Sequence, residues 1–318
     1  MFTSYASSST TGAKRTSTTE REIGALDQRV TMIITEVGDG YRFVTQPDHG
    51  ALAGRLAAHW GNGRFDEPAP RSAVCLAATH HDHGWHDYDL RPHRADDGTL
   101  RDFTNVPDEE WVSFYTRGIE AVAAVDAYAG LLTSMHATGL HRGGYGVRPS
   151  IPDQSDEPPY ESFIAEQERF QRERLTELRD GRYSQYAGED ERELLSDLHE
   201  TGTVEELAAS AAGSRLWRNY LLLQTVDVLS LFLCGSASLE RTEIGPAPTA
   251  DSETASLGIE PLGPSTVETK PSPFDTAPLA VSVPARTVPE LDLNSTDESE
   301  LVAAFYGAEQ RSVEFTLR

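Results

Sequence analysis

An acidic residue inside the most apolar stretch of the sequence constrains the fold more than any other feature. The apolar run from Tyr220 to Cys234 is interrupted by Gln224 and Asp227. An ionised carboxylate in an apolar core costs several kcal/mol unless a cation or a metal ion compensates it. The run is also shorter than the roughly 20 apolar residues that cross a bilayer. We therefore expect a buried helix whose Asp227 meets positive charge in a core that no membrane surrounds.

Histidines are the expected partners of this carboxylate. Ten histidines occur in the chain, and seven of them lie within residues 49–93. His49 lies on the apolar face of one predicted helix, and His81 and Asp82 lie on that of the next. With Asp227 they follow the order H…HD…D of HD domains, at spacings of 32, 1 and 145 residues. Imidazole and carboxylate together suit Mn, Fe, Co, Ni or Zn, so the sequence predicts a divalent metal site at these four residues.

Two further histidines extend this set. His136 shares a helical stripe with Leu132, and His141 follows after a Thr-Gly break. With one or both of them the cluster could hold two ions, as in binuclear HD phosphohydrolases and di-iron HD oxygenases. We take Asp82 and His136 as candidate catalytic residues, because Asp82 can bridge to a second ion or orient a water molecule.

Simpler interpretations of these residues stay open. A lone histidine on an apolar face is more often a hydrogen-bonded core residue than a ligand. Asp227 could pair with Arg117 or Arg218, and His80 could take the place of His81. The remaining histidines of the region are expected beside the ligands or at the surface: His59, His83, His86 and His93.

Residues that could contact a substrate are marked more weakly. Arg142 and Arg148 flank a glycine-rich segment whose backbone N–H groups could bind an anion. Trp85 and Asp102-Phe-Thr104 could line a pocket wall. An ordinary turn and a simple loop anchor are the competing interpretations. Two carboxylates are candidate general bases: Asp89 and Glu166.

The charge composition points to the solvent more than to a partner. The net charge is −24, and of the 27 basic residues only Lys14 and Lys270 are lysines, which leaves 25 arginines. This bias resembles that of halophilic proteins, whose carboxylates stay hydrated near 1 M salt, where the Debye length is about 3 Å. No basic stripe is present to replace phosphate counterions, so nucleic acid is not an expected partner. Cys75 and Cys234 are expected to be buried thiols, and no signal peptide is visible, so we expect a cytoplasmic protein.

The pattern of predicted elements favours an α+β protein that is predominantly α. We expect an HD-like helical bundle with a small antiparallel sheet made from an N-terminal hairpin and C-terminal strands. These strands are predicted over residues 30–36, 41–46, 279–284 and 312–317. Residues 236–275 are rich in Pro, Ser, Thr and Glu and are expected to be loop-like.

Three parts of the chain are expected. Residues 1–27 are rich in Ser and Thr and are predicted to be a disordered tail. Residues 28–235 would hold the hairpin and the HD-like helical domain. Residues 236–318 would hold a loop-rich segment and the C-terminal strands, packed on the same domain.

Several short motifs occur in order along the chain. They are Gln46-Pro-Asp-His49, His81-Asp-His-Gly-Trp85, Asp102-Phe-Thr104, Ser134-Met-His136 and the late-helix Asp227. With these motifs, residues 30–318 resemble a family of prokaryotic proteins of unknown function. The chain departs from the family at His83, where an acid is usual, and at His141, where an aromatic residue is usual. The resemblance implies a common structure and does not supply an activity.

Metal-dependent hydrolysis of a phosphoester or a related small molecule is the leading hypothesis. One or two ions of Mn, Fe, Ni, Co or Zn would lower the pKa of a bound water molecule and polarise the scissile group. A di-iron oxygenase that also uses His136 is the first alternative. A metal-stabilised binding protein, or a degenerate HD protein without turnover, is the second.

Overall fold

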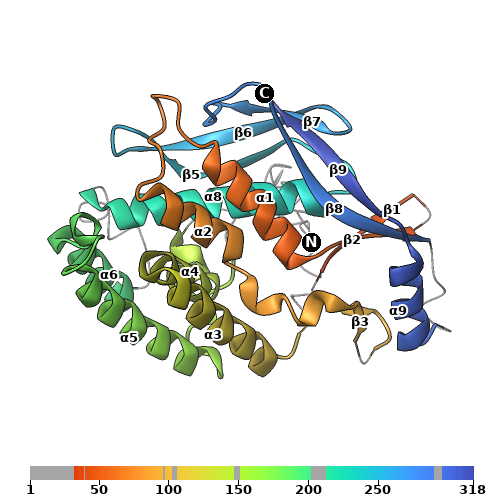
Figure 1. The fold of residues 1–318 in the computed structure, drawn as a ribbon, viewed down its shortest axis with the longest axis horizontal. Coiled ribbons are helices and arrows are strands. Elements are labelled where there is room, and N and C mark those ends of the chain that lie inside the picture. The colour runs from red at the N-terminus through yellow and green to blue at the C-terminus, as the bar shows by residue number, and fades with distance from the viewer. Residues whose placement is uncertain are drawn as a thin grey trace, which may run out of the picture.

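The computed structural model describes residues 32–38, 40–95, 97–101, 106–146, 151–201, 213–289 and 296–318. The predicted disordered tail, Asp102-Phe-Thr104 and Arg148 therefore lie outside the described residues. Within them, a curved sheet covers one side of a pair of helices, and further helices cover the other side of that pair (Figure 1).

Seven strands form the main sheet, in the order β1-β2-β8-β9-β7-β6-β5. Neighbouring strands are antiparallel, except that β7 and β9 are parallel. As predicted, the N-terminal hairpin pairs with a C-terminal strand, because β2 pairs with β8 from Gly40 opposite Pro289 to Phe43 opposite Arg286. The strands are β1 (Ile33–Val37), β2 (Gly40–Val44), β5 (Thr242–Pro248), β6 (Thr254–Gly263), β7 (Thr266–Lys270), β8 (Leu279–Pro289) and β9 (Gln310–Leu317). A separate pair is made of β3 (His93–Arg94) and β4 (Leu100–Arg101).

The predicted helical bundle with a small antiparallel sheet is wrong. The sheet is large and mixed, and residues 236–275, which were expected to be loop-like, contain β5, β6 and β7. Each of these strands buries few large apolar side chains, such as Leu257 and Ile259 in β6 and Val267 in β7. Their prolines resemble loop residues in the sequence. The structure accommodates them at an edge strand and at irregularities in the β5–β6 and β6–β7 pairings.

Apart from α9, which packs at one end of the sheet, the helices within the described ranges form two layers. The helices α1 and α8 pack on the sheet, and α2 to α6 lie on their far side (Figure 1). They are α1 (Gln46–Ala58), α2 (Arg71–His80), α3 (Asp108–Val125), α4 (Ala127–His141), α5 (Tyr160–Leu178), α6 (Glu189–Thr201), α8 (Arg215–Gly235) and α9 (Glu298–Gly307). None of the described helices combines the length and the apolar content needed to cross a bilayer.

The helix α8 holds the predicted buried carboxylate between the two layers. Its N-terminus is capped by Ser214, whose hydroxyl accepts the N–H of Trp217. At its C-terminus Arg42 of β2 donates to the carbonyl oxygens of Cys234 and Ser236. These contacts satisfy polar groups that a helix end leaves open. They fix α8 against the sheet, with its middle turns facing the other helices.

Candidate metal centre

Close contact between α1 and α2 brings the first two predicted ligands together. A Cβ atom on Gly50 of α1 would lie 2.6 Å from the carbonyl oxygen of Thr79, and one on Gly54 would overlap the Thr79 side chain. Only glycine allows the two backbones to approach this closely. Because His49 directly precedes Gly50 and His81 follows Thr79 by two residues, this contact places both imidazoles in one space.

Four side chains from three segments converge in this space. The Nε2 atoms of His49 and His81 lie 3.2 Å apart. Asp227 Oδ1 lies 3.1 Å from His49 Nε2 and 3.2 Å from His81 Nε2. Asp82 Oδ2 lies 3.2 Å from His81 Nε2 and 3.7 Å from His49 Nε2. The two histidine side chains are fully buried, while those of Asp82 and Asp227 are 10% and 7% exposed.

These separations are those of the ligand atoms around a single ion. Nitrogen and oxygen ligands bind zinc-like ions at about 2.0–2.2 Å, so neighbouring ligand atoms lie about 3 Å apart. The four converging atoms are 3.1 to 3.7 Å apart in the pairs measured. The two carboxylates form the part of the cluster that reaches solvent.

Hydrogen bonds outside the cluster orient the two imidazoles. His81 Nδ1 lies 2.9 Å from the carbonyl oxygen of Ala78, which can only accept, so Nδ1 carries a proton. Ser230 donates its hydroxyl proton to the carbonyl of Asp227 and therefore accepts from His49 Nδ1 at 2.8 Å. In the neutral form both rings then direct an unprotonated Nε2 into the cluster. This is the arrangement by which proteins prepare histidines as metal ligands.

His136 of α4 borders the same cluster. Its ring centroid lies 4.8 Å from that of His81, at an interplanar angle of 78°. His136, His81 and Asp227 each offer a ligand atom within 4.8 Å of the others. The amide nitrogen of Gln224 lies 2.6 Å from His136 Nδ1. In this orientation the amide donates and Nε2 carries the proton, whereas the flipped amide would accept from Nδ1 and leave Nε2 as a ligand atom.

A tyrosine holds the second carboxylate. Tyr115 of α3 donates its hydroxyl to Asp82 Oδ1 at 2.6 Å, which leaves Oδ2 facing the histidines. The approach of α3 depends on Gly84, because a Cβ atom there would overlap the carbonyl of Phe114. Tyr115, next to Phe114, thereby reaches the segment that carries Asp82.

The two carboxylates of the cluster are ionised although they are buried, so they need a compensating positive charge. Burial by itself raises the pKa of Asp82, but the nearby His81 lowers it to about 2. The pKa of Asp227 is lowered further by His81 and His49, again against the effect of burial. Burial lowers the pKa of His81, but Asp82 and Asp227 raise it well above its usual value. Burial and the charge of His81 lower the pKa of His136 to about 4. Two ionised carboxylates therefore need a cation, either a proton on His81 or a metal ion.

A family model described as a protein of unknown function, DUF3891, matches residues 32–290. The match covers well over half of the 318 residues. The chain belongs to the DUF3891 family. All the residues of the cluster, and His136, lie within the matched region. A comparison with curated proteins and one with solved structures each found no match.

The competing partners of Asp227 lie elsewhere in this DUF3891 chain. Arg218 pairs with Asp66 at 3.2 Å, and Arg117 donates to the backbone carbonyl of Ser113. His80 is also outside the cluster, and its ring packs against that of His83 instead. Of the neighbouring histidines, the structure brings His81 rather than His80 to His49.

The residues proposed for substrate contact do not gather at the cluster. Arg142 pairs with Glu168 of α5 at 2.5 Å, and Trp85 is 1% exposed and packs on Phe114 as a core residue. His141 stacks on Tyr160 with ring centroids 3.7 Å apart. The remaining candidates are placed as follows: Glu166 is exposed on α5, Asp89 is buried, and Arg148 lies outside the described residues.

Asp89 has the properties of an acid rather than a base. It is 4% exposed, and its Oδ2 accepts the backbone N–H of Gln46 at 2.6 Å, in the first turn of α1. Burial, together with the charge of Asp82, raises its pKa to about 8. Asp89 therefore carries a proton near neutral pH.

Sequence reasoning missed the residues that hold the ligands in place. Gln224 and Ser230 lie three residues before and three after Asp227, so they share its side of α8. Polar residues at this spacing in an apolar helix were a signal that could have identified them. Tyr115 gave no such signal, because an aromatic residue on an amphipathic helix is an ordinary core residue.

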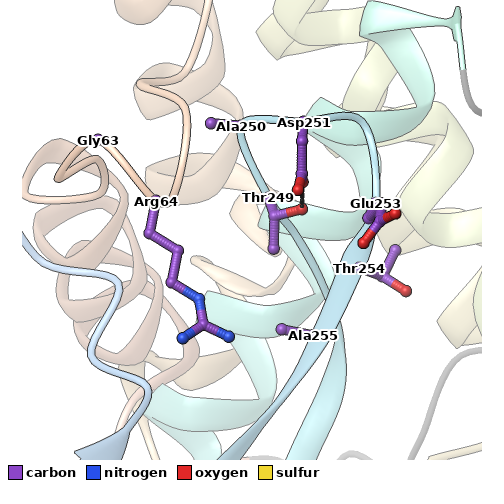
Figure 2. A pocket seen from close by; sticks show the side chains of 8 residues that line it. All are labelled: Gly63, Arg64, Thr249, Ala250, Asp251, Glu253, Thr254 and Ala255. Carbon is purple, nitrogen blue, oxygen red and sulfur yellow. Dashed lines mark hydrogen bonds between the residues drawn. The ribbon is translucent and has the colours of Figure 1, made fainter.

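A hollow of about 210 Å³ lies elsewhere on the described surface, between the connection from α1 to α2 and the turn from β5 to β6 (Figure 2). Figure 2 shows Arg64 on one side of it and Asp251 and Glu253 on the other. None of the residues that line it belongs to the cluster. We assign this hollow no part in the metal centre.

Proposed function

We propose that this chain is a metal-dependent hydrolase of a phosphoester or a related small molecule. Its ion would be bound by His49, His81, Asp82 and Asp227, with His136 as a further ligand. The observation that carries the proposal is the convergence of two imidazole nitrogens and two carboxylate oxygens at 3.1 to 3.7 Å. The order of the ligands in the chain is the H…HD…D order of HD hydrolases.

Protons alone satisfy this cluster less well than an ion. If His81 is protonated on both nitrogens, its Nε2–H can form one good hydrogen bond, yet it faces two carboxylates at 3.2 Å. His49 directs its own Nε2 at the same point, 3.2 Å from His81 Nε2. One divalent ion would bind all four atoms at once and would neutralise both carboxylates. A mixed set of imidazole and carboxylate favours Mn, Fe, Co, Ni or Zn.

When bound, the ion would lower the pKa of a coordinated water molecule and polarise the scissile group. The protein's own residues would orient this chemistry. Tyr115 would hold Asp82 in position. Arg142 is engaged by Glu168, so it is not proposed as a substrate clamp.

A second function is favoured by one specific observation, the burial of the cluster. The ligand side chains are at most 10% exposed, which suits an ion that stabilises the fold without turnover. A structural ion would leave the protein inactive but more stable. Two iron ions would instead favour the oxygenase alternative.

The decisive experiment is a turnover assay of protein loaded with Mn, Fe, Co, Ni or Zn against phosphomonoesters, phosphodiesters, pyrophosphate and nucleotides. We expect hydrolysis of at least one class, loss of that activity in Asp82→Asn and Asp227→Asn, and its retention in Glu168→Gln. The control removes a carboxylate that is 9% exposed and pairs with Arg142. Metal-loaded protein that turns over none of these substrates would contradict the hydrolase proposal and favour the structural ion.

A further inference from the structure

The number of ions that the buried cluster can hold depends on how many of its ligand atoms are still available. His49 and His81 can each bind an ion only through Nε2, because the Nδ1 atom of each ring is held by a hydrogen bond, to Ser230 and to the carbonyl of Ala78. The described residues contain two sets of groups that could hold an ion, and both sets include His81. Two ions could therefore lie here only if they shared a ligand.

A carboxylate is the group that two ions can share. In two-metal sites the ions lie about 3.5–4 Å apart, a separation that a carboxylate spans when each of its oxygens binds one ion. Asp82 is the candidate for this role, because it directly follows His81 and its Oδ2 already faces His49 and His81. A second ion would then have to bind Asp82 Oδ1.

Tyr115 already occupies this oxygen. Its hydroxyl donates to Asp82 Oδ1 at 2.6 Å, and the residue is only 5% exposed. The ring of Tyr115 also lies beside His136, with the ring centroids 6.5 Å apart. His136 is the histidine that the second set of groups adds to the first. The tyrosine therefore contacts or borders both groups that a second ion would need, and its hydroxyl proton would repel a cation placed at Oδ1.

The position of Tyr115 is fixed by close packing. A Cβ atom on Gly84 would overlap the carbonyl of Phe114, and one on Gly118 would lie 2.7 Å from the backbone nitrogen of Gly84. On α3 itself, the ring of Trp111 packs on that of Tyr115 with centroids 4.0 Å apart. Because interiors packed this closely resist displacement, the tyrosine is not free to turn away when an ion approaches.

We propose that Tyr115 is a positioning residue that limits the buried centre to a single ion. It would keep Asp82 as a ligand through Oδ2 alone, with His136 available to the same ion. The inference rests on the proposed function, since it requires an ion in the cluster. It makes the proposed hydrolase a one-ion enzyme and leaves no place for the two iron ions of an oxygenase.

The test is a titration of chelator-treated protein with Mn²⁺, followed by electron paramagnetic resonance. The wild-type protein should bind one equivalent with the spectrum of an isolated ion. Tyr115→Phe keeps the ring but leaves Asp82 Oδ1 without its donor, so this variant should bind a second equivalent whose spin is coupled to the first. Tyr160→Phe is the matched control, because Tyr160 donates at 2.7 Å to Asp108, a carboxylate outside the cluster, and it should bind one.

The outcomes separate this inference from the proposed function. Two coupled equivalents in the wild-type protein would overturn the one-ion centre and leave hydrolysis untouched, whether or not the variant folds. A single equivalent in both the wild-type protein and Tyr115→Phe would overturn the role of Tyr115. One isolated ion without turnover of any substrate would contradict the hydrolase and leave the inference standing. A protein that binds no ion would contradict both.

Discussion

Two buried polar regions lie on opposite sides of α4. They differ in whether they contain enough hydrogen-bond donors for their acceptors. Toward α5, Ser134 donates to Gln167, and Gln171 donates to Ser134 and to Thr138. Toward α8, His136 borders a cluster in which two carboxylates face the Nε2 atoms of His49 and His81. The first region is a neutral network whose donors and acceptors match, whereas the second has more acceptors than donors.

This difference separates a structural network from a binding centre. Matched buried hydrogen bonds stabilise a fold, and removal of one partner leaves the others unsatisfied. A cluster of mutually repelling acceptors is stable only when a cation completes it. The same helix therefore contributes to packing on one face and to the proposed chemistry on the other.

Asp227→Asn should produce the largest effect in the cluster. With the ion at 1,000 times its Kd, binding stabilises the native state by about 4 kcal/mol. The variant should lose this metal-dependent gain, measured as the shift in the unfolding midpoint between chelated and metal-loaded protein. Glu168→Gln, the control on the other side of α4, should retain the full shift. An equal shift in both variants would remove the distinction between the two regions.

Gly54→Ala should weaken the cluster without touching a ligand. The added methyl group overlaps the Thr79 side chain and separates α1 from α2. Overpacking of this kind costs about 1–3 kcal/mol, and the displaced helices should also reduce the metal affinity. Denaturant unfolding and metal titration measure the two effects. Gly307→Ala is the control, because nothing lies within 4 Å of its added Cβ atom. Unchanged affinity in Gly54→Ala would show that the helix contact does not position the ligands.

Gln171→Met, in the neutral network, should lower the stability of the protein without changing its metal content. Loss of the amide leaves Ser134, Thr138 and His199 without a partner that they contact in the native state. The cost should be about 1–3 kcal/mol of unfolding free energy, with no change in the metal content. Chemical denaturation and metal analysis of the same sample would measure both. Loss of metal in this variant would mean that the two faces of α4 are coupled.

Asp89→Asn tests whether a buried carboxyl group without a nearby cation is protonated in the folded protein. Because the folded-state pKa is raised to about 8, the folded protein holds a proton that the unfolded chain releases near pH 4. This contribution to stability is fully present below the unfolded pKa and is lost as the pH rises through about 8. Relative to Asp89→Asn, the wild type should lose up to about 1.4 kcal/mol per pH unit within this range. If the unfolding free energies of the two proteins changed in parallel with pH, Asp89 would not be protonated in the folded protein.

The position of the cluster in the sequence was predictable because its chemistry is local. Asp227 in an apolar helix, and His49 and His81–Asp82 on apolar stripes, mark polar groups that a core accepts only with a partner. The cluster also needs the contact of Gly50 and Gly54 with Thr79. This contact depends on how α1 and α2 pack, and no periodic pattern in the sequence indicates it. The support of Asp82 by Tyr115 is of the same kind.

The sheet was harder to predict for a different reason. The N-terminal and C-terminal strands alternate clearly, and β1, β2, β8 and β9 were found close to their expected places. The strands β5 to β7 are rich in Pro, Ser and Thr and bury few side chains each. Their stability comes from pairing with neighbours far away in the chain, such as β7 with β9, so no local pattern marks them.

The most direct test of the central claim is the metal content of the native protein. The protein would be purified without chelator in molar KCl, which its charge of −24 favours, and analysed by plasma mass spectrometry. We expect one or two equivalents of Mn, Fe, Co, Ni or Zn, lost in Asp82→Asn and Asp227→Asn and retained in Glu168→Gln. A folded native protein that contains none of these metals and takes none up would contradict the metal centre. It would leave Asp227 as a structural carboxylate paired with His81.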